Sequence, residues 1–230
     1  MLPPGSRNSG TILCYVTDRH NFSNPRHPDA HERLLESIKR AVQAGVDWIQ
    51  LREKDLAAGA YAQLTRQALV LLQQPYSGHP QFARLLVNDR LDVALAEHAG
   101  GVHLGENSLP VGEAKRLLRL PSSAQTRPTD FLVGVSCHSL DSAISAAGSG
   151  ADYIFFGPVF DTPSKAAFGP PQGLERLAAV CRSISIPVLA IGGITLENAP
   201  RCLDAGANGL AAIRLFQDAV DLPALVRALR

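Results

Sequence analysis

The sequence predicts a single (β/α)8 barrel, also called a TIM barrel. Short apolar runs rich in β-branched residues alternate with longer amphipathic stretches, and this pair repeats eight times along 230 residues, about the length that such a barrel needs. A doubly wound open sheet is the alternative, but no expected strand is followed by a GxGxxG turn. One domain is therefore expected over residues 1–230, with residues 1–10 as a flexible N-terminal extension.

Eight apolar runs are the expected strands, and helices should cover them because parallel apolar strands are connected by right-handed crossovers. The strands are TILCYVT from Thr11, DWIQLR from Asp47, RLLVN from Arg84, GGVHL from Gly100, FLVGVS from Phe131, DYIFFG from Asp152, PVLAIGG from Pro187 and GLAAIR from Gly209. The clearest helices, by apolar spacing of three and four residues, are His31–Ala44, Ala60–Gln73, Leu140–Gly148 and Asn198–Ala205. Two stretches are expected loops: Gln74–Gln81 and Pro121–Pro128.

The overall charge argues against nucleic-acid or membrane binding. Lysine and arginine number 22 against 21 acidic residues, so no basic field covers the protein and an anionic ligand must be met locally. Four cysteines without CxxC spacing suit a reducing compartment and argue against structural zinc. No apolar run approaches the roughly 20 residues of a membrane span. We expect a cytoplasmic protein that acts on small molecules.

Chemistry in such barrels lies at the C-terminal ends of the strands, and the second strand ends in WIQLREKD. Strand alternation places Gln50, Arg52 and Lys54 on one side. Their two cations suit a phosphate or diphosphate, the arginine as a bidentate donor and the lysine as a point charge. For an isolated triplet the alternative is a salt-bridged barrel mouth, with Glu53 and Asp55 as partners of the cations.

The third and fourth strands end with Asn88, Asp89 and His103. Asp89 precedes a helix and could be an N-cap. A carboxylate at the same mouth as the two cations could equally hold Mg²⁺ against a diphosphate, because Mg²⁺ commonly takes one or two carboxylates plus phosphate oxygens. A lone histidine such as His103 is more often structural.

The fifth strand ends in GVSCHS. Ser136 and Ser139 could cap the following helix while His138 fills the turn. Alternatively, Ser136 binds an oxyanion and His138 transfers a proton, since histidine titrates near neutral pH. Cys137 carries little weight as a nucleophile, because the sequence provides no specific activating base.

The last strands suggest a binding loop and a phosphate site. The long segment FGPVFDTPSKAAFGPPQG contains Thr162, Ser164 and Lys165, and loops of this length are commonly lids or binding loops. The turn after AIGGIT offers the backbone amides of Gly192 and Gly193, which can approach an oxyanion closely at the usual phosphate site of these barrels.

Taken together, the ordered motifs QLREK, VNDR, GVHLG, GVSCHS, DYIFFGPVFDTPSK, PVLAIGGIT and AGANGLAAI resemble those of the thiamine phosphate synthase superfamily, from about Tyr15 to about Phe216. The synthases of this superfamily join a hydroxymethylpyrimidine diphosphate to a thiazole phosphate and release pyrophosphate with Mg²⁺. Pyrophosphate departure leaves a resonance-stabilised cation, so catalysis stabilises leaving-group charge and excludes water.

The resemblance implies a role for each matching residue. The pyrimidine would be contacted by Gln50 and His103, and the diphosphate would be held by Arg52, Lys54, Asn88, Ser136 and Lys165. Asp89 would bind the Mg²⁺. The thiazole would be flanked by Thr162 and Ser164, and its phosphate would bind at Gly192 and Gly193.

The sequence departs from the family pattern at three places. Ser108 stands where the turn after GVHLG usually supplies an aspartate, so Mg²⁺ would bind more weakly or use Glu106. Lys165 is followed by two alanines where an acidic residue is usual. Arg214 replaces a small residue at the thiazole phosphate, where its guanidinium should strengthen the site.

Two alternative functions remain. The related thiazole tautomerase uses a histidine, matched here by His138, to move a proton on a thiazole carboxylate phosphate, and losing a second metal ligand would not harm that reaction. Gln50 and the NDR triplet fit the synthase better. A non-catalytic barrel that binds a thiazole phosphate is the third hypothesis. The partners expected are small phosphorylated substrates, and the sequence leaves open whether the barrel forms a homodimer.

Overall fold

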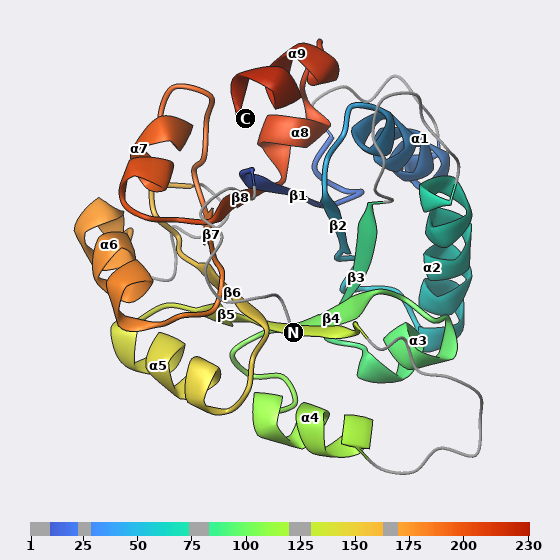
Figure 1. Ribbon diagram of the computed structural model, residues 1–230. Coiled ribbons are helices and arrows are strands. Elements are labelled where there is room, and N and C mark those ends of the chain that lie inside the picture. The colour runs from blue at the N-terminus through green and yellow to red at the C-terminus, as the bar shows by residue number, and fades with distance from the viewer. Residues whose placement is uncertain (1–9, 23–28, 74–82, 120–129, 163–169) are drawn as a thin grey trace.

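Eight parallel strands close into a barrel in sequence order, with the last strand paired back to the first (Figure 1). The computed structural model describes residues 10–22, 29–73, 83–119, 130–162 and 170–230. The strands are β1 (Ile12–Val16), β2 (Trp48–Leu51), β3 (Arg84–Asn88), β4 (Gly101–Leu104), β5 (Leu132–Cys137), β6 (Tyr153–Phe156), β7 (Val188–Ile191) and β8 (Gly209–Ala212). Seven lie within their predicted runs, and β5 extends one residue past its run to Cys137. The predicted (β/α)8 barrel is confirmed.

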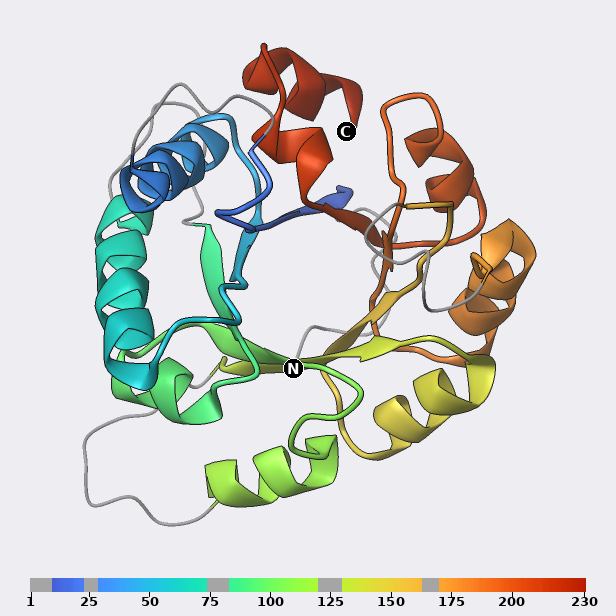
Figure 2. The ribbon, with the colours of Figure 1, turned by 180° about the vertical axis from the view of Figure 1, so that it is seen from behind.

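The helices form a ring outside the strands, as both views show (Figures 1 and 2). They are α1 (Ala30–Gln43), α2 (Ala58–Leu72), α3 (Leu91–Ala96), α4 (Val111–Arg119), α5 (Leu140–Gly148), α6 (Gly173–Ser183), α7 (Ala199–Asp204), α8 (Arg214–Gln217) and α9 (Leu222–Ala228). The four predicted helices are α1, α2, α5 and α7, with ends that differ by at most two residues. The two predicted loops and the N-terminal extension fall largely outside the described residues.

Strand alternation divides the apolar residues into two clusters. Outward-facing residues pack under the helices, and inward-facing residues fill the barrel: Cys14, Val16, Trp48, Leu86, Tyr153, Phe155, Leu189 and Ala211. Gly134 makes room for this inner cluster, because a Cβ there would lie 2.0 Å from the Tyr153 ring. The interior is therefore a packed core rather than a pore.

Toward the C-terminal ends of β2 to β5, the inward-facing positions become polar. Each of these four strands contributes one such side chain: Gln50, Asn88, His103 and Ser136. The polar residues thus lie at the end of the barrel where active sites of this fold are found. Among the described residues, no helix is long and apolar enough to cross a membrane.

Candidate active site

Gln50 and Asn88 link the ends of β2 and β3 inside the barrel. Gln50 Nε2 donates a hydrogen bond of 2.9 Å to Asn88 Oδ1, and both side chains are buried. The Asn88 amide in turn donates to Asp89 Oδ2 at 2.8 Å. The two amides therefore hold a carboxylate in place at the barrel mouth.

Asp89 is held by three donors and does not cap a helix. Its Oδ1 accepts from the Gly105 backbone N–H at 3.0 Å and from the Ser108 hydroxyl. The helix α3 follows Arg90, which is its N-cap residue and has no side-chain cap bond, so the N-cap alternative for Asp89 is wrong. Asp89 also has a backbone φ of 61°, a conformation that aspartate adopts more readily than most residues.

The donor set around Asp89 fits Mg²⁺ that is held mainly by a substrate. Among the described residues, no group of three or more His, Cys, Asp or Glu side chains could form a closed metal site. Oδ1 already accepts two hydrogen bonds, whereas Oδ2 accepts one and keeps a lone pair. Ser108 contacts Asp89 directly, while Glu106 lies exposed in the same turn. One carboxylate beside a hydroxyl suits an ion whose other ligands are phosphate oxygens and water.

The cations after β2 are not neutralised by the neighbouring acids. Arg19 takes those acids instead: its Nη1 donates to buried Glu53 at 3.0 Å and to exposed Asp55 at 2.9 Å. The hydrogen bonds from Arg19 and then from His20 lower the pKa of Asp55 to about 2. Within the described ranges, half-buried Arg52 and exposed Lys54 form no ion pair. The alternative of a salt-bridged mouth, with Glu53 and Asp55 as partners of Arg52 and Lys54, is therefore wrong, and these acids leave both charges available to an anionic ligand.

The second strand ends at Leu51, so strand alternation does not extend to Arg52 and Lys54 as the sequence predicted, and a hydrogen-bonded turn follows. The Arg52 backbone N–H donates to Thr17 Oγ1 at 2.9 Å, and the Thr17 hydroxyl donates to Glu53 Oε1 at 2.7 Å. The turn that carries Arg52 is therefore fastened to the end of β1. Sequence reasoning missed this link.

Tyr61 in α2 provides a second hydrogen-bonded link between strand ends. Its hydroxyl donates to the Leu51 carbonyl and accepts the Asn88 backbone N–H at 3.2 Å. One phenol therefore bridges the ends of β2 and β3, the two strands that carry the cations and Asp89. The sequence gives no local signal for this role, since the bridge depends on how α2 packs.

His103 lies inside the barrel with both ring nitrogens bonded to hydroxyl groups. Its Nδ1 lies 3.1 Å from the Tyr153 hydroxyl, its Nε2 lies 3.0 Å from Ser136 Oγ, and its ring centroid lies 4.1 Å from that of Phe155. Burial lowers the pKa of His103 to about 3, against the opposing effect of the Asp89 carboxylate and with a smaller contribution from Arg52. The imidazole is therefore neutral near pH 7.

The rest of the fifth-strand motif has structural partners. Ser139 and Ser142 form the capping box of α5, so the predicted cap is confirmed for Ser139, whereas Ser136 contacts His103 instead. His138 is half-buried, with Nδ1 against the Gly157 carbonyl oxygen. Burial raises the pKa of the Cys137 thiol to about 11, which agrees with the low weight given to it as a nucleophile.

The turn after β7 requires both of its glycines. Gly192 has a φ of 95° and Gly193 a φ of 66°. A Cβ would lie 2.5 Å from Pro158 Cβ in the first case and 2.5 Å from the Asp161 carbonyl oxygen in the second. The turn therefore packs closely against the segment after β6, and both positions require glycine.

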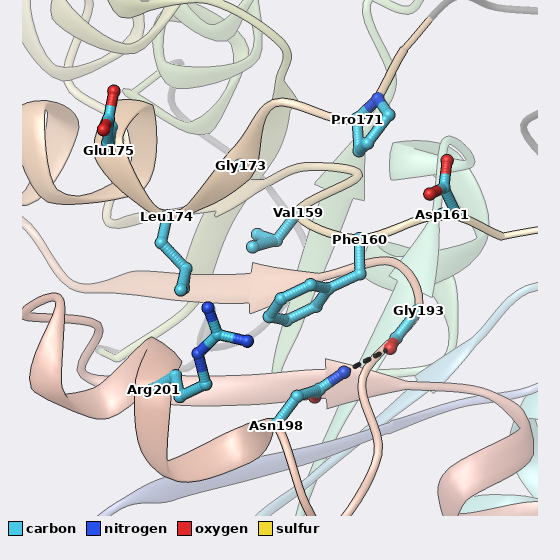
Figure 3. Close-up of a pocket in the computed structure, with 10 residues that line it drawn as sticks. All are labelled: Val159, Phe160, Asp161, Pro171, Gly173, Leu174, Glu175, Gly193, Asn198 and Arg201. Carbon is cyan, nitrogen blue, oxygen red and sulfur yellow. Dashed lines mark hydrogen bonds between the residues drawn. The ribbon is translucent and has the colours of Figure 1, made fainter.

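A groove of about 570 Å³ borders this turn (Figure 3). It is lined by Val159, Phe160, Asp161, Pro171, Gly173, Leu174, Glu175, Gly193, Asn198 and Arg201. Asn198 Nδ2 donates to the Gly193 carbonyl at 2.9 Å, and the Arg201 guanidinium lies 6.0 Å from the Phe160 ring centroid. The start of α7 thus supports the glycine turn.

The remaining predicted site residues are less defined. Thr162 is half-buried at the end of a described range, and Ser164 and Lys165 lie outside the described residues. Arg214 is exposed and is the first residue of α8, directly after β8. The structure therefore brings Gln50, Asn88 and Asp89 together in one bonded group, and His103 and Ser136 in another.

Comparison with known proteins agrees with this arrangement. The sequence profile described as thiamine monophosphate synthase matches residues 13–216. The chain belongs to this family. The thiamine-phosphate synthase of Methanocella arvoryzae is 40% identical over 218 residues, which cover 95% of this chain and 92% of that one. The synthase of Methanoculleus marisnigri is 41% identical over 228 residues, covering 96% and 94%.

Solved structures give the same relationship. The thiamine phosphate pyrophosphorylase from Pyrococcus furiosus superposes with a TM-score of 0.75 at 32% sequence identity, and the match covers 95% of this chain and 94% of that one. The family likeness therefore extends over the whole barrel and includes all of the strand ends described above.

Proposed function

We propose that this protein is a thiamine-phosphate synthase that joins hydroxymethylpyrimidine diphosphate to thiazole phosphate and releases pyrophosphate. The observation that carries the proposal is the bonded group of Gln50, Asn88 and Asp89 beside two cations, Arg52 and Lys54, that the neighbouring acids leave free. Relatives about 40% identical over nearly the whole chain carry the name of this activity. Its substrates would be small phosphorylated molecules, and the charge balance and four free cysteines favour a cytoplasmic site of action.

In the proposed reaction, the carbon–oxygen bond to the diphosphate breaks and the thiazole nitrogen forms a new bond to the pyrimidine methylene carbon. Negative charge grows on the departing pyrophosphate, where Arg52 and Lys54 would stabilise it, together with Asn88, Ser136 and Lys165. Asp89, with Ser108 beside it, would hold Mg²⁺, which neutralises diphosphate charge when bound. Gln50 would orient the pyrimidine.

The thiazole phosphate would occupy the opposite side of the mouth. Backbone amides of Gly192 and Gly193 would bind it, aided by the guanidinium of Arg214, and Thr162 and Ser164 would flank the ring. The support for this assignment is the position of the turn after β7, at the end of the barrel where phosphate sites of this fold are commonly found. If a phosphate bound at Gly193 left Arg214 pointing into solvent, the role of Arg214 would be dismissed.

One observation favours the thiazole tautomerase as a second candidate. The contact between His138 Nδ1 and the Gly157 carbonyl places the ring proton on Nδ1 and leaves Nε2 as a base. Ser108 in place of a second carboxylate points the same way. The synthase remains favoured because the amide pair of Gln50 and Asn88 has no use in that proton transfer.

One assay separates the two functions. The protein is incubated with both synthase substrates and Mg²⁺, and pyrophosphate and thiamine phosphate are followed together. A synthase should form both products, stop in chelator and lose activity in Asp89→Ala. A lack of thiamine phosphate at saturating Mg²⁺, together with metal-independent isomerisation of added thiazole carboxylate phosphate that is lost in His138→Ala, would establish the tautomerase instead.

A further inference from the structure

We propose that Tyr153 and His103 form a hydrogen-bonded relay that fixes the Ser136 hydroxyl as a donor toward the bound diphosphate. In this relay the two are positioning residues, since they act on the diphosphate through Ser136. The inference rests on the proposed synthase function only where it names the diphosphate as the acceptor.

The relay is built across three adjacent strands. Tyr153 lies on β6, His103 on β4 and Ser136 on β5, and the imidazole lies between the two hydroxyls at 3.1 Å and 3.0 Å. Tyr153 is fully buried, and His103 is 2% exposed. Gly134 on β5 creates the space for the phenol, because a Cβ there would overlap its ring. The phenol, imidazole and serine therefore have fixed positions.

The direction of the hydrogen bonds follows from the buried phenol. A neutral imidazole has one N–H and one lone pair, so it donates at one nitrogen and accepts at the other. Among the described residues, His103 is the only hydrogen-bond partner of the Tyr153 hydroxyl. If Nδ1 carried the proton, the phenol proton would be buried without an acceptor, which is a costly arrangement. Tyr153 therefore donates to Nδ1, and Nε2–H donates to Ser136 Oγ.

This direction decides what Ser136 presents to a ligand. Because Ser136 Oγ accepts from His103, its own proton is free to be donated elsewhere, and within the described part of the chain it forms no hydrogen bond to another acceptor. A diphosphate oxygen is an acceptor only, so a donating hydroxyl matches it. The reverse relay would present lone pairs to the anion. Through His103, the buried Tyr153 thus determines that Ser136 donates a hydrogen bond to the substrate rather than accepting one.

A double-mutant cycle tests the coupling. Tyr153→Phe keeps the ring and removes the phenol proton, and it should lower kcat/KM for the pyrimidine diphosphate by about tenfold. In a Ser136→Ala background the same change should have no further effect, because the group it acts on is gone. Tyr15→Phe is the matched control: this buried tyrosine bonds to Ser37 and Gln217, and its effect should be equal in both backgrounds. Equal effects of Tyr153→Phe in both backgrounds would overturn the relay.

A second measurement does not depend on catalysis. ¹⁵N NMR of histidine-labelled protein, with His103 assigned from a His103→Gln variant, reports which ring nitrogen carries the proton. We expect the Nε2–H tautomer in the unchanged protein and a mixture of tautomers in Tyr153→Phe. An Nδ1–H tautomer would refute the relay. If the tautomer is as expected and no thiamine phosphate forms, the proposed function fails while the relay stands.

Discussion

Arg19 and Arg52 follow adjacent strands at the mouth of the barrel, yet their surroundings differ. Arg19 is bonded to two carboxylates, Glu53 and Asp55, whereas Arg52 forms no ion pair among the described residues. The two acids that neighbour Arg52 in sequence thus form their ion pairs with Arg19, which follows β1. A guanidinium without a fixed protein anion is the better ligand for an incoming diphosphate, because no existing ion pair must be broken.

Arg52→Ala should therefore lower coupling turnover without unfolding the protein. Losing one preorganised donor to developing charge costs about 2.7 to 4 kcal/mol, or roughly a hundredfold to a thousandfold in kcat. Lys165→Ala should behave in the same way. Arg66→Ala, which removes an exposed ion pair with Glu97 on the outer surface, is the control and should leave turnover unchanged. Unchanged turnover in a folded Arg52→Ala protein would remove Arg52 from the site.

Gly193→Ala should weaken binding of the thiazole phosphate and destabilise the fold. The new Cβ would meet the Asp161 carbonyl oxygen at 2.5 Å, in a backbone conformation with φ of 66° that favours glycine. KM for the thiazole phosphate should rise more than kcat falls. Gly59→Ala in α2 is the control: nothing lies within 4 Å of its Cβ, so it should stabilise by about 0.5–1 kcal/mol in urea unfolding. Equal stability of the two variants would contradict this account.

At the scale of the element, helices position strand ends through single hydroxyl groups. Tyr61 of α2 bridges β2 and β3, and Tyr15 of β1 bonds to Ser37 of α1 and to Gln217 of α8. The eight strands could be predicted because an apolar run is a local signal. These bridges could not, since each depends on how residues far apart in the sequence pack.

Tyr61→Phe should lower both stability and turnover. The change leaves the Asn88 N–H and the Leu51 carbonyl without their partner in a buried place, which costs about 1–3 kcal/mol. Turnover should fall because Asn88 and Asp89 lose a fixed position relative to Arg52. Tyr15→Phe should cost similar stability with little change in turnover. Urea unfolding and initial rates measure both, and unaltered kinetics in Tyr61→Phe would show that the bridge is structural only.

Polar side chains are distributed unevenly around the mouth of the barrel. Strands β2 to β5 contribute the polar side chains Gln50, Asn88, His103 and Ser136, whereas β7 contributes a glycine turn. Motif order predicted which residues lie at strand ends. It did not predict that Ser136 contacts His103 rather than a helix, because that contact depends on the closed barrel and on the space left by Gly134.

Burial of a neutral histidine in this barrel should make the stability of the metal-free protein depend on pH. The pKa of His103 is about 3 in the folded state, against about 6.5 in an unfolded chain. Between these values the unfolded chain binds a proton that the folded protein does not, so the free energy of unfolding falls as the pH falls. The slope attributable to His103 should approach about 1.4 kcal/mol per pH unit.

His103→Gln removes this proton while leaving the carboxylates in place. Urea unfolding of the two proteins at pH 7, 6, 5 and 4 should therefore show a stability advantage of the unchanged protein that shrinks as the pH falls below about 6.5. The carboxylates titrate alike in both proteins, so their contribution cancels in the difference. A difference that stays constant over this range would mean that His103 takes up its proton in the folded barrel as readily as in the unfolded chain, which would contradict the effect of burial on its pKa.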